Sequence, residues 1–187
     1  GRVSCTISRN GDLVHKMYIQ YIPTEIIGSA ASTFYPKFGC GLLKEVELEI
    51  GGQMIDRHYS HWLSAYEDLT QKNDTRVFQA TTNGNNYPND GTFTKYQALS
   101  GNYMGGGNAN LIDKAGPTEH FMPLQFWFCR NVGLALPLIA LQYHEVKLYW
   151  TLPTEAELTA GTDATRNVSN CKLFVDYIYL DTDERRR

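Results

Sequence analysis

The chain has 187 residues, a formal net charge of −3, 42% hydrophobic and 20% charged residues, which are ordinary values for one globular domain. This balance excludes the strongly basic surface expected of a nucleic-acid-binding domain, so no direct contact with nucleic acid is predicted. No secretory signal is evident, and the longest apolar run, from Gly133 to Leu141, is far too short to span a bilayer.

Strand patterns open the chain, which begins without Met, as expected of a processed product, an excised piece or an incompletely numbered longer protein. Apolar residues alternate with polar ones from Val3 to Ile7, which is the period of a half-buried strand. Asn10-Gly11 has the composition of a two-residue hairpin turn, and a longer strand pattern runs from Asp12 to Ile22. We therefore predict two strands joined by a tight hairpin.

The segment from Glu45 to Ile50 is the clearest strand in the sequence. Its glutamates point to one side, whereas its valine, leucine and isoleucine point to the other. Such a row of like charges is typical of a solvated face, or of a sheet edge that is protected against mispairing. Gly51-Gly52 then permits a tight turn into a strand from Gln53 to His58.

One short helix is predicted from Ser60, which is a candidate N-cap. The apolar residues that recur at helical spacing are Trp62, Leu63, Tyr66 and Leu69. Glu67 and Asp68 are expected to face away from this apolar side, towards solvent.

Two long loops are predicted in the rest of the chain. Asn73 to Gly116 is rich in Asn and Gly and reads as a surface insertion, and Pro153 to Asn170 is a second polar loop. Strand patterns cover Phe121–Cys129, Leu136–Ala140, Gln142–Leu152 and Cys171–Leu180. The terminal Arg185–Arg187 run is interpreted as a solvated chain end or a cut linker.

About eight strands with one helix predict an antiparallel sandwich or barrel. Strands do not alternate with long helices, which argues against a parallel α/β sheet. The apolar run from Leu134 to Leu141 contains Pro137, which cannot continue a plain helix or a central strand. We expect this run to pack between the sheets or under a neighbouring subunit.

Few residues have the spacing that catalysis or metal binding requires. His58 and His61 lie three residues apart and form a metal site only if Asp56 joins them, so a solvated helix start is the interpretation we favour. His144 and Glu145 are adjacent in a predicted strand and point to opposite faces. No nucleophile motif is present, so we predict no catalytic residue, no metal, no cofactor and no enzymatic activity.

The four cysteines, Cys5, Cys40, Cys129 and Cys171, include no CxxC pair. Cys5 and Cys171 fall at apolar strand positions and are expected to be reduced core residues. Gly105–Gly107 lacks the Lys-Ser/Thr that a phosphate-binding loop needs. Asn73 and Asn167 begin N-glycosylation sequons in the two predicted loops and are the only candidate modification sites.

Several blocks of this sequence, in order and at matching spacing, resemble one protein family closely. The blocks are Asn10–Leu13, Val46–Gln53, Ile55–Tyr59, Trp62, Phe126–Phe128, Gly133–Lys147 and Val175–Glu184. They look like the major capsid proteins of nucleocytoplasmic large DNA viruses, especially those of algal viruses and iridoviruses. The resemblance spans nearly the whole chain, and Gly133–Lys147 is its most specific block.

The resemblance implies an all-β fold, an eight-stranded antiparallel jelly-roll sandwich with one short helix and long inserted loops. Residues 1–187 would form one jelly-roll domain, the first of a tandem pair whose second roll is absent from this sequence. It implies a structural major capsid protein that self-assembles into trimeric, pseudo-hexagonal capsomers of an icosahedral viral shell. Its implied partners are its own copies, neighbouring capsomers and minor capsid proteins. Its implied location is the virion, after assembly in the host cytoplasm.

Two other functions remain open from the residues alone. A carbohydrate-binding jelly roll would use Tyr87, Tyr96 and Tyr103 of the long insertion to stack on sugars of the host surface. The plainer interpretation is that these aromatic residues anchor the loop to the body of the domain. A cupin-like enzyme would need clustered His and carboxylate ligands, and the sequence lacks that spacing.

Overall fold

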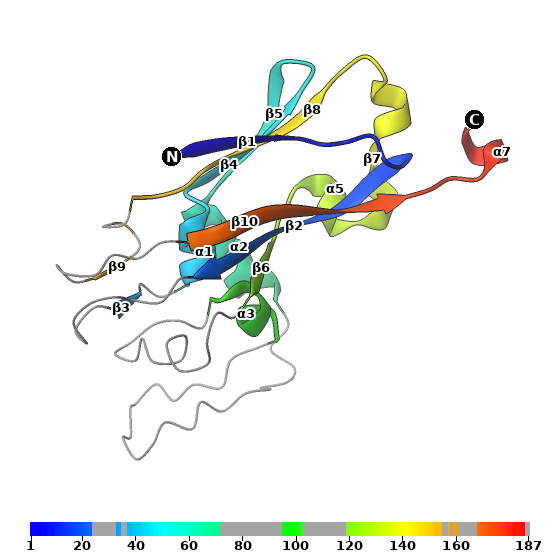
Figure 1. The fold of residues 1–187 in the computed structure, drawn as a ribbon. Helices are drawn as coiled ribbons and strands as arrows, with labels where there is room; N and C mark the ends of the chain where they lie inside the picture. The colour runs from blue at the N-terminus through cyan, green and yellow to red at the C-terminus, as the bar shows by residue number, and fades with distance from the viewer. Residues whose placement is uncertain are drawn as a thin grey trace.

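The structure, a computed structural model, describes residues 1–23, 33–34, 37–71, 95–102, 119–154, 157, 159–160 and 168–185. Its main strands form two antiparallel sheets that lie face to face (Figure 1). The first sheet has the order β1-β8-β4-β5, with bounds Arg2–Thr6, Val146–Thr151, Glu45–Ile50 and Gln53–Tyr59. The second has the order β10-β2-β6 with β7 beside β2, and bounds Val168–Ile178, Leu13–Pro23, His120–Pro123 and Leu136–Pro137. The predicted antiparallel all-β sandwich is confirmed.

Shorter elements join and flank these sheets. Strands β3 and β9 pair with each other, with bounds Thr33–Phe34 and Thr159–Ala160. The α-helices α1, α2, α3, α5 and α7 have the bounds Phe38–Leu42, Ser60–Thr70, Lys95–Ser100, Trp127–Arg130 and Thr182–Arg185. The 3-10 helices η1 and η2 have the bounds Val132–Leu134 and Leu138–Leu141. The predicted helix corresponds to α2, the longest helix in the described part of the chain.

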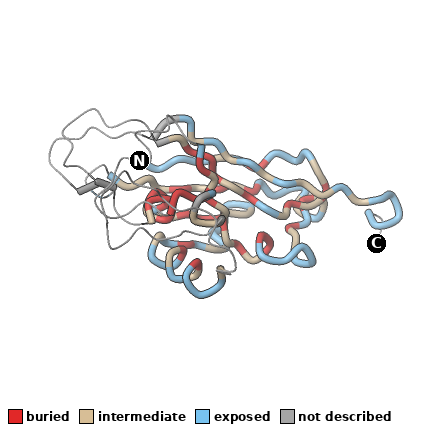
Figure 2. The backbone as a smooth tube through the Cα atoms, turned by 90° about the horizontal axis from the view of Figure 1, so that it is seen from below, coloured by how far each residue is buried: buried red, intermediate tan, exposed pale blue. Residues whose placement is uncertain are grey.

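The hydrophobic core lies between the two sheets (Figure 2). On β8, Val146, Leu148 and Trp150 alternate inward and are buried. Val46 and Leu48 of β4 are buried beside them, in register with Trp150 and Leu148. Burial of each such side chain contributes about 1.5–3 kcal/mol, so this period-two alternation both forms the strands and stabilises the sandwich.

The two lateral sides of the sandwich differ. On one side α1 and α3 contact β6 while α2 contacts β5, so helices bridge the edges of the two sheets. On the other side β1 and β10 are edge strands, and a groove of about 240 Å³ lies between them. Its lining includes Ile7, Leu173 and Tyr177.

Cys5 and Cys171 were expected to be reduced core residues. Both are free thiols that pack against the core, but they are only partly buried.

The predicted N-terminal hairpin is wrong. Strands β1 and β2 belong to different sheets, so Asn10-Gly11 lies in a crossover between sheets and not in a two-residue turn. Gly11 is instead required by a close approach, because a Cβ atom there would lie 2.7 Å from Cβ of Tyr177. A turn-like dipeptide thus marks a tight packing contact between the crossover and β10.

The glutamates of β4 do not protect a sheet edge, because β4 lies between β8 and β5. Glu47 is buried and pairs with both Arg2 and Arg57. The tight turn after β4 is confirmed, since Gly51 and Gly52 have φ values of 59° and 83°. Positive φ is strained for residues with a Cβ atom, which is why two glycines are needed there.

Helix α2 begins where it was predicted, but its N-cap residue and the exposure of two of its side chains differ from the prediction. Tyr59, and not Ser60, occupies the N-cap position. Glu67 is buried at 3% exposure, whereas Leu69 is 86% exposed. The helical spacing of Leu69 predicts that its side chain is buried. The buried face of α2 instead packs on α1 and includes the Glu67 carboxylate, which accepts a hydrogen bond from Asn102 there.

The strand predicted from Phe121 to Cys129 is shorter in the structure. It ends at Pro123, which has no N–H to donate to a sheet ladder, and α5 follows. The segment from Leu136 to Ala140 likewise gives only a two-residue strand and part of η2, so Leu136 and Leu138 are buried while Leu134 is exposed. β8 begins only at Val146, so His144 and Glu145, which were predicted to lie in a strand, precede it.

Candidate functional site

The histidine pair considered as a metal site is not assembled as one. The His58 Nε2 atom lies 3.3 Å from Oδ2 of Asp56, whereas His61 is exposed. Burial is the main cause that lowers the pKa of His58, and the Asp56 carboxylate opposes this shift. In the described part of the chain, no three His, Cys, Asp or Glu side chains converge in a way that could hold a metal ion.

His58 belongs to a column of stacked rings that begins in the core. The rings in order are Phe128, Phe126, His58, Trp62 and Tyr66, with centroid separations of 5.7, 4.8, 4.2 and 5.0 Å. The Arg130 guanidinium lies 5.7 Å from the outermost ring centroid. Both faces of the half-exposed Trp62 are therefore covered, and the column packs β5, α2 and α5 together instead of offering a stacking platform.

The outer face of the first sheet carries a compensated charge network. Glu47 forms ion pairs with Arg2 of β1 and with Arg57 of β5. The Arg57 Nε atom also lies 3.1 Å from Oε1 of Glu45. The Arg2 guanidinium lies over the Tyr149 ring at 4.6 Å. These contacts link strands β1, β8, β4 and β5, so the carboxylates of Glu45 and Glu47 on this face are paired with arginines.

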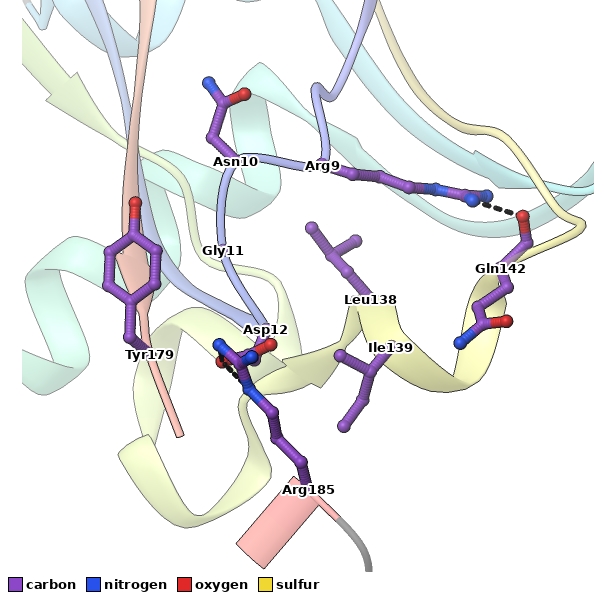
Figure 3. A pocket seen from close by; sticks show the side chains of 9 residues that line it. All are labelled: Arg9, Asn10, Gly11, Asp12, Leu138, Ile139, Gln142, Tyr179 and Arg185. Atoms are coloured by element: carbon purple, nitrogen blue, oxygen red, sulfur yellow. Dashed lines mark hydrogen bonds and ion pairs between the residues drawn. The ribbon is translucent and has the colours of Figure 1, made fainter. Parts of the chain in front are cut away.

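A corner cavity of about 300 Å³ lies where the β1–β2 crossover meets η2 and the C-terminal segment (Figure 3). The Arg9 guanidinium donates to the carbonyl oxygens of Leu141 at 2.6 Å, His144 at 3.0 Å and Gln142. These three acceptors hold the turn before β8 against the crossover. These three hydrogen bonds give Arg9 a structural role at this corner.

Asp12 anchors the C-terminal segment at the same corner (Figure 3). Its Oδ2 atom accepts from the backbone N–H of Leu180 at 2.7 Å, and from Nε and Nη2 of Arg185 at 3.0 and 2.8 Å. The Leu180 hydrogen bond is the largest cause that lowers the pKa of Asp12, and Arg185 lowers it further. Sequence analysis placed Arg185 in a solvated chain end, and this ion pair corrects that interpretation.

Replacing Asp12 with Asn is expected to lower the melting temperature and to expose α7 to proteolysis. Because the folded pKa of Asp12 lies below its ordinary value of 3.8, its stabilisation is present above that pH and is lost as pH falls through the folded pKa. Thermal denaturation should therefore show a deficit for Asp12→Asn at neutral pH that shrinks in acid. Asp183→Asn, an exposed change in α7, is the control, and an equal deficit in both variants would contradict this role for Asp12.

The other residues singled out from the sequence divide into two groups. Tyr96 lies in α3, partly buried, and burial raises its pKa, which fits an anchoring residue better than an exposed sugar platform. Those outside the described residues are Asn73, Tyr87, Tyr103, Gly105–Gly107 and Asn167. Glycosylation and sugar stacking at these positions therefore stay predictions. No helix in the described ranges is long and apolar enough to cross a membrane.

The fold and its surfaces define a class of protein before any comparison. Two antiparallel sheets form a sandwich with charge pairs on the outer face of the first sheet, helices on one side and a pinned C-terminal corner. Its ionisable clusters in the described residues pin structural elements to one another. This is the construction of a structural domain, in which loops vary around a fixed core.

A family model described as the major capsid protein N-terminus matches residues 1–181. The chain therefore belongs to the major capsid protein family. It is 44% identical over 186 residues to the major capsid protein of Pyramimonas orientalis virus, and 38% identical over 190 residues to that of Paramecium bursaria Chlorella virus 1. Each comparison covers 100% of this chain but only 42% and 38% of the relative. The chain thus spans about two fifths of the length of these relatives.

Solved structures agree with this assignment. PBCV-1 VP54, whose crystal structure was fitted into a cryo-EM reconstruction of the virophage Sputnik, matches with a TM-score of 0.65 and 36% identity. A quasi-atomic model of the PBCV-1 virus capsid matches with a TM-score of 0.64. Both matches cover 100% of this chain and 40% of the other. The fold is therefore the capsid jelly roll that the resemblance implied, and the family recognised from the sequence blocks is confirmed.

Sequence reasoning missed the Asp12–Arg185 pair and the Arg9 contacts. One signal was available, because Asp12 lies in the block Asn10–Leu13 and Arg185 directly follows the block Val175–Glu184, and both blocks carry the family resemblance. Spacing alone could not join them, since the two residues lie 173 positions apart. Only the fold brings the crossover and the C-terminal segment to one corner.

Proposed function

We propose that this chain is the N-terminal jelly-roll domain of a structural major capsid protein and that it has no catalytic activity. The single observation that carries the proposal is the family match over residues 1–181, supported by relatives named as major capsid proteins. The chain aligns with the first part of proteins more than twice its length, which is consistent with a tandem second roll in the intact polypeptide.

In the intact protein, three copies would form a pseudo-hexagonal capsomer, and capsomers would tile an icosahedral shell in the virion after assembly in the host cytoplasm. Neighbouring capsomers and minor capsid proteins would be its partners. The paired charges on the outer face of the first sheet suit this role, because compensated charge avoids like-charge repulsion between copies. Attachment of host glycans by the long insertion remains a subsidiary prediction.

The assembly proposal is tested with the full reading frame that encodes this sequence. Size-exclusion chromatography with light scattering should give a mass three times that of the polypeptide, and negative-stain electron microscopy should show hexagonal particles. Residues 1–187, expressed alone, form the second arm and show whether one roll is enough for trimers. A full-length protein that stays monomeric at high concentration, without hexagonal particles, would overturn the proposal.

The absence of enzymatic function is tested separately by elemental analysis of the same purified protein. We expect substoichiometric metal after dialysis, because the ligand pattern of a cupin is missing from the sequence. A metal bound at one equivalent per chain would revive the cupin-like alternative. A glycan array of the full-length protein and of its Tyr87→Ala/Tyr103→Ala variant tests the sugar-binding prediction, which requires binding that these substitutions remove while α3 stays in place.

A further inference from the structure

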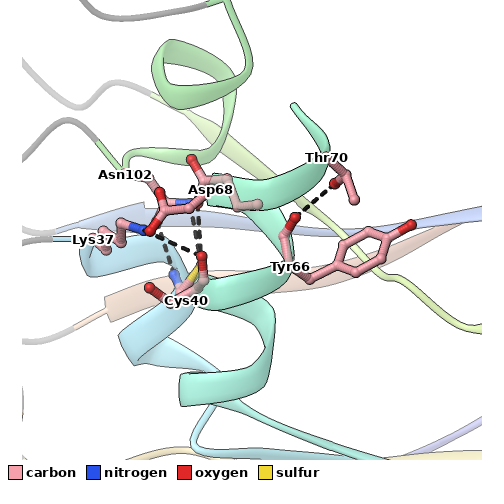
Figure 4. Close-up of polar contacts among 8 residues, drawn as sticks. Lys37, Cys40, Tyr66, Asp68, Thr70 and Asn102 are labelled. Carbon is pink, nitrogen blue, oxygen red and sulfur yellow. Dashed lines mark hydrogen bonds and ion pairs between the residues drawn. The ribbon is translucent and has the colours of Figure 1, made fainter. Parts of the chain in front are cut away.

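A buried polar cluster lies beneath α2, on the side of the sandwich that the helices cover. Its members are Cys40 of α1, Glu67 of α2 and Asn102 in the turn after α3, and all three are at most 5% exposed. We call these three residues the Glu67 latch. Figure 4 shows Asn102 close to Cys40 and Lys37, which both belong to the segment of α1. The capsid role does not use this cluster, and no metal-ligand group is formed by it among the described residues.

Hydrogen bonds join the three elements of the latch. The Asn102 Nδ2 atom donates to Oε2 of Glu67 at 2.6 Å and lies 3.2 Å from Sγ of Cys40. The Asn102 Oδ1 atom accepts from the backbone N–H of Cys40 at 2.9 Å. The Cys40 thiol lies 3.5 Å from the same Oε2 atom of Glu67. One carboxyl oxygen therefore receives the donors that tie α1, α2 and the turn together.

The other carboxyl oxygen of Glu67, Oε1, is buried without a hydrogen-bond partner. A buried ionised carboxylate is costly unless both oxygens are satisfied. The Lys37 ammonium offsets this cost only in part, because its Nζ lies 2.5 Å from Oδ2 of Asp68 and donates to the carbonyl of Ser64. A proton on Oε1 would remove the charge and leave the bonds at Oε2 intact.

From this geometry we propose that Glu67 is a proton-controlled latch: its neutral carboxyl holds α1, α2 and the turn at Asn102 together, and loss of the proton loosens them. Loosening separates the Asn102 side chain from the backbone N–H of Cys40. The device is independent of the capsid proposal, since it depends only on contacts within this domain.

Two of the groups that face Glu67 do not titrate between mildly acidic and mildly basic pH, and the pKa of Glu67 itself is raised. Burial is the largest cause that raises the pKa of Glu67 above its ordinary value of 4.5, while Lys37 lowers it and Asp68 raises it. Burial also raises the pKa of the Cys40 thiol to about 12, and it raises the pKa of Tyr96 on α3. Cys40 and Tyr96 thus stay neutral throughout this range.

The sign of the pH effect follows from the raised pKa. Above 4.5 the unfolded or locally opened chain releases a proton that the closed latch retains. Stability is therefore complete below that pH and declines as pH rises through the folded pKa of Glu67. The closed latch should open about tenfold more often for each unit by which the closed-state pKa exceeds the open-state value.

Hydrogen exchange at the Cys40 amide tests the latch directly, because that N–H bonds to the Asn102 side chain. Protection factors, corrected for the intrinsic pH dependence of exchange, are measured by NMR between about pH 5 and about pH 8. In the unmodified protein the Cys40 protection factor should fall across this range. In Glu67→Gln, whose side chain cannot lose a proton, it should stay constant. Glu184→Gln, the same change on exposed α7, should retain the fall.

An identical pH dependence in the unmodified protein and in Glu67→Gln would overturn the proposal. If Glu67→Gln does not fold, the carboxyl carbon of Glu67 is titrated by ¹³C NMR in the unmodified protein. A midpoint clearly above 4.5 that coincides with the loss of Cys40 protection would support the latch. A midpoint at or below 4.5 would overturn it.

Discussion

Replacing Gly39 with alanine is expected to lower the free energy of unfolding by about 3 kcal/mol or more, at the upper end of the effects of overpacking. A Cβ atom at Gly39 would lie 1.9 Å from the carbonyl oxygen of Ser100, which is backbone and cannot rotate away. That oxygen also accepts the buried Tyr21 hydroxyl hydrogen bond at 2.8 Å. Helix α1 and the turn after α3 would have to separate, and denaturant unfolding followed by circular dichroism measures the loss.

Gly133→Ala is the matched control for this prediction. A Cβ atom at Gly133 meets only the side-chain oxygen of Asn131, at 3.4 Å, and Gly133 is exposed with no positive φ. The same chemical change should therefore alter the unfolding free energy by less than about 1 kcal/mol. Equal losses in Gly39→Ala and Gly133→Ala would show that the close approach of α1 to Ser100 does not exist in solution.

Truncating Phe126 to alanine should cost about 3–5 kcal/mol of unfolding free energy. Phe126 is 0% exposed and stacks between Phe128 and His58, so its removal leaves a cavity in the middle of the ring column. Loss of its ring should also free His58, which now lies between Phe126 and Trp62. Urea titration followed by tryptophan fluorescence measures the loss of stability.

Phe174→Ala provides the comparison for Phe126→Ala. Phe174 is 45% exposed on β10 and makes an edge contact with Phe121 at 5.8 Å. Because no enclosed cavity follows its truncation, the expected loss is about 1 kcal/mol or less. A loss for Phe174→Ala as large as that for Phe126→Ala would contradict the placement of the core between the two sheets.

The buried and exposed faces of the strands in the first sheet were predictable, because the alternation of apolar and polar residues is a local property. On β4 the apolar residues Val46 and Leu48 point inward, as the sequence indicates. The sequence does not show which strands lie beside β4. Its Glu47 was therefore expected on a solvated or edge position, whereas Arg57 of the neighbouring β5 and Arg2 of β1 cover it. Burial of a charge depends on partners that are distant in the chain.

Helix α2 likewise has local features that the sequence predicts and a buried face that only the tertiary structure decides. Its start and length follow from local spacing, but the direction of its buried face depends on what packs beneath it. Glu67 faces inward because Asn102, 35 residues later, supplies a hydrogen-bond donor there. The periodicity of apolar residues could not reveal this, since it counts a carboxylate as a solvent-facing residue.

The sequence by itself determined the all-β class and the family, because strand alternation and the conspicuous blocks such as Gly133–Lys147 are local patterns. It also determined the glycine turn at Gly51-Gly52, where positive φ selects the residue type. Only the tertiary structure decided that Asn10-Gly11 crosses between sheets and that Asp12 receives Arg185. The same holds for the Glu67 latch. These features join residues far apart in the chain, and the free energy of such contacts depends on burial and geometry that no local pattern contains.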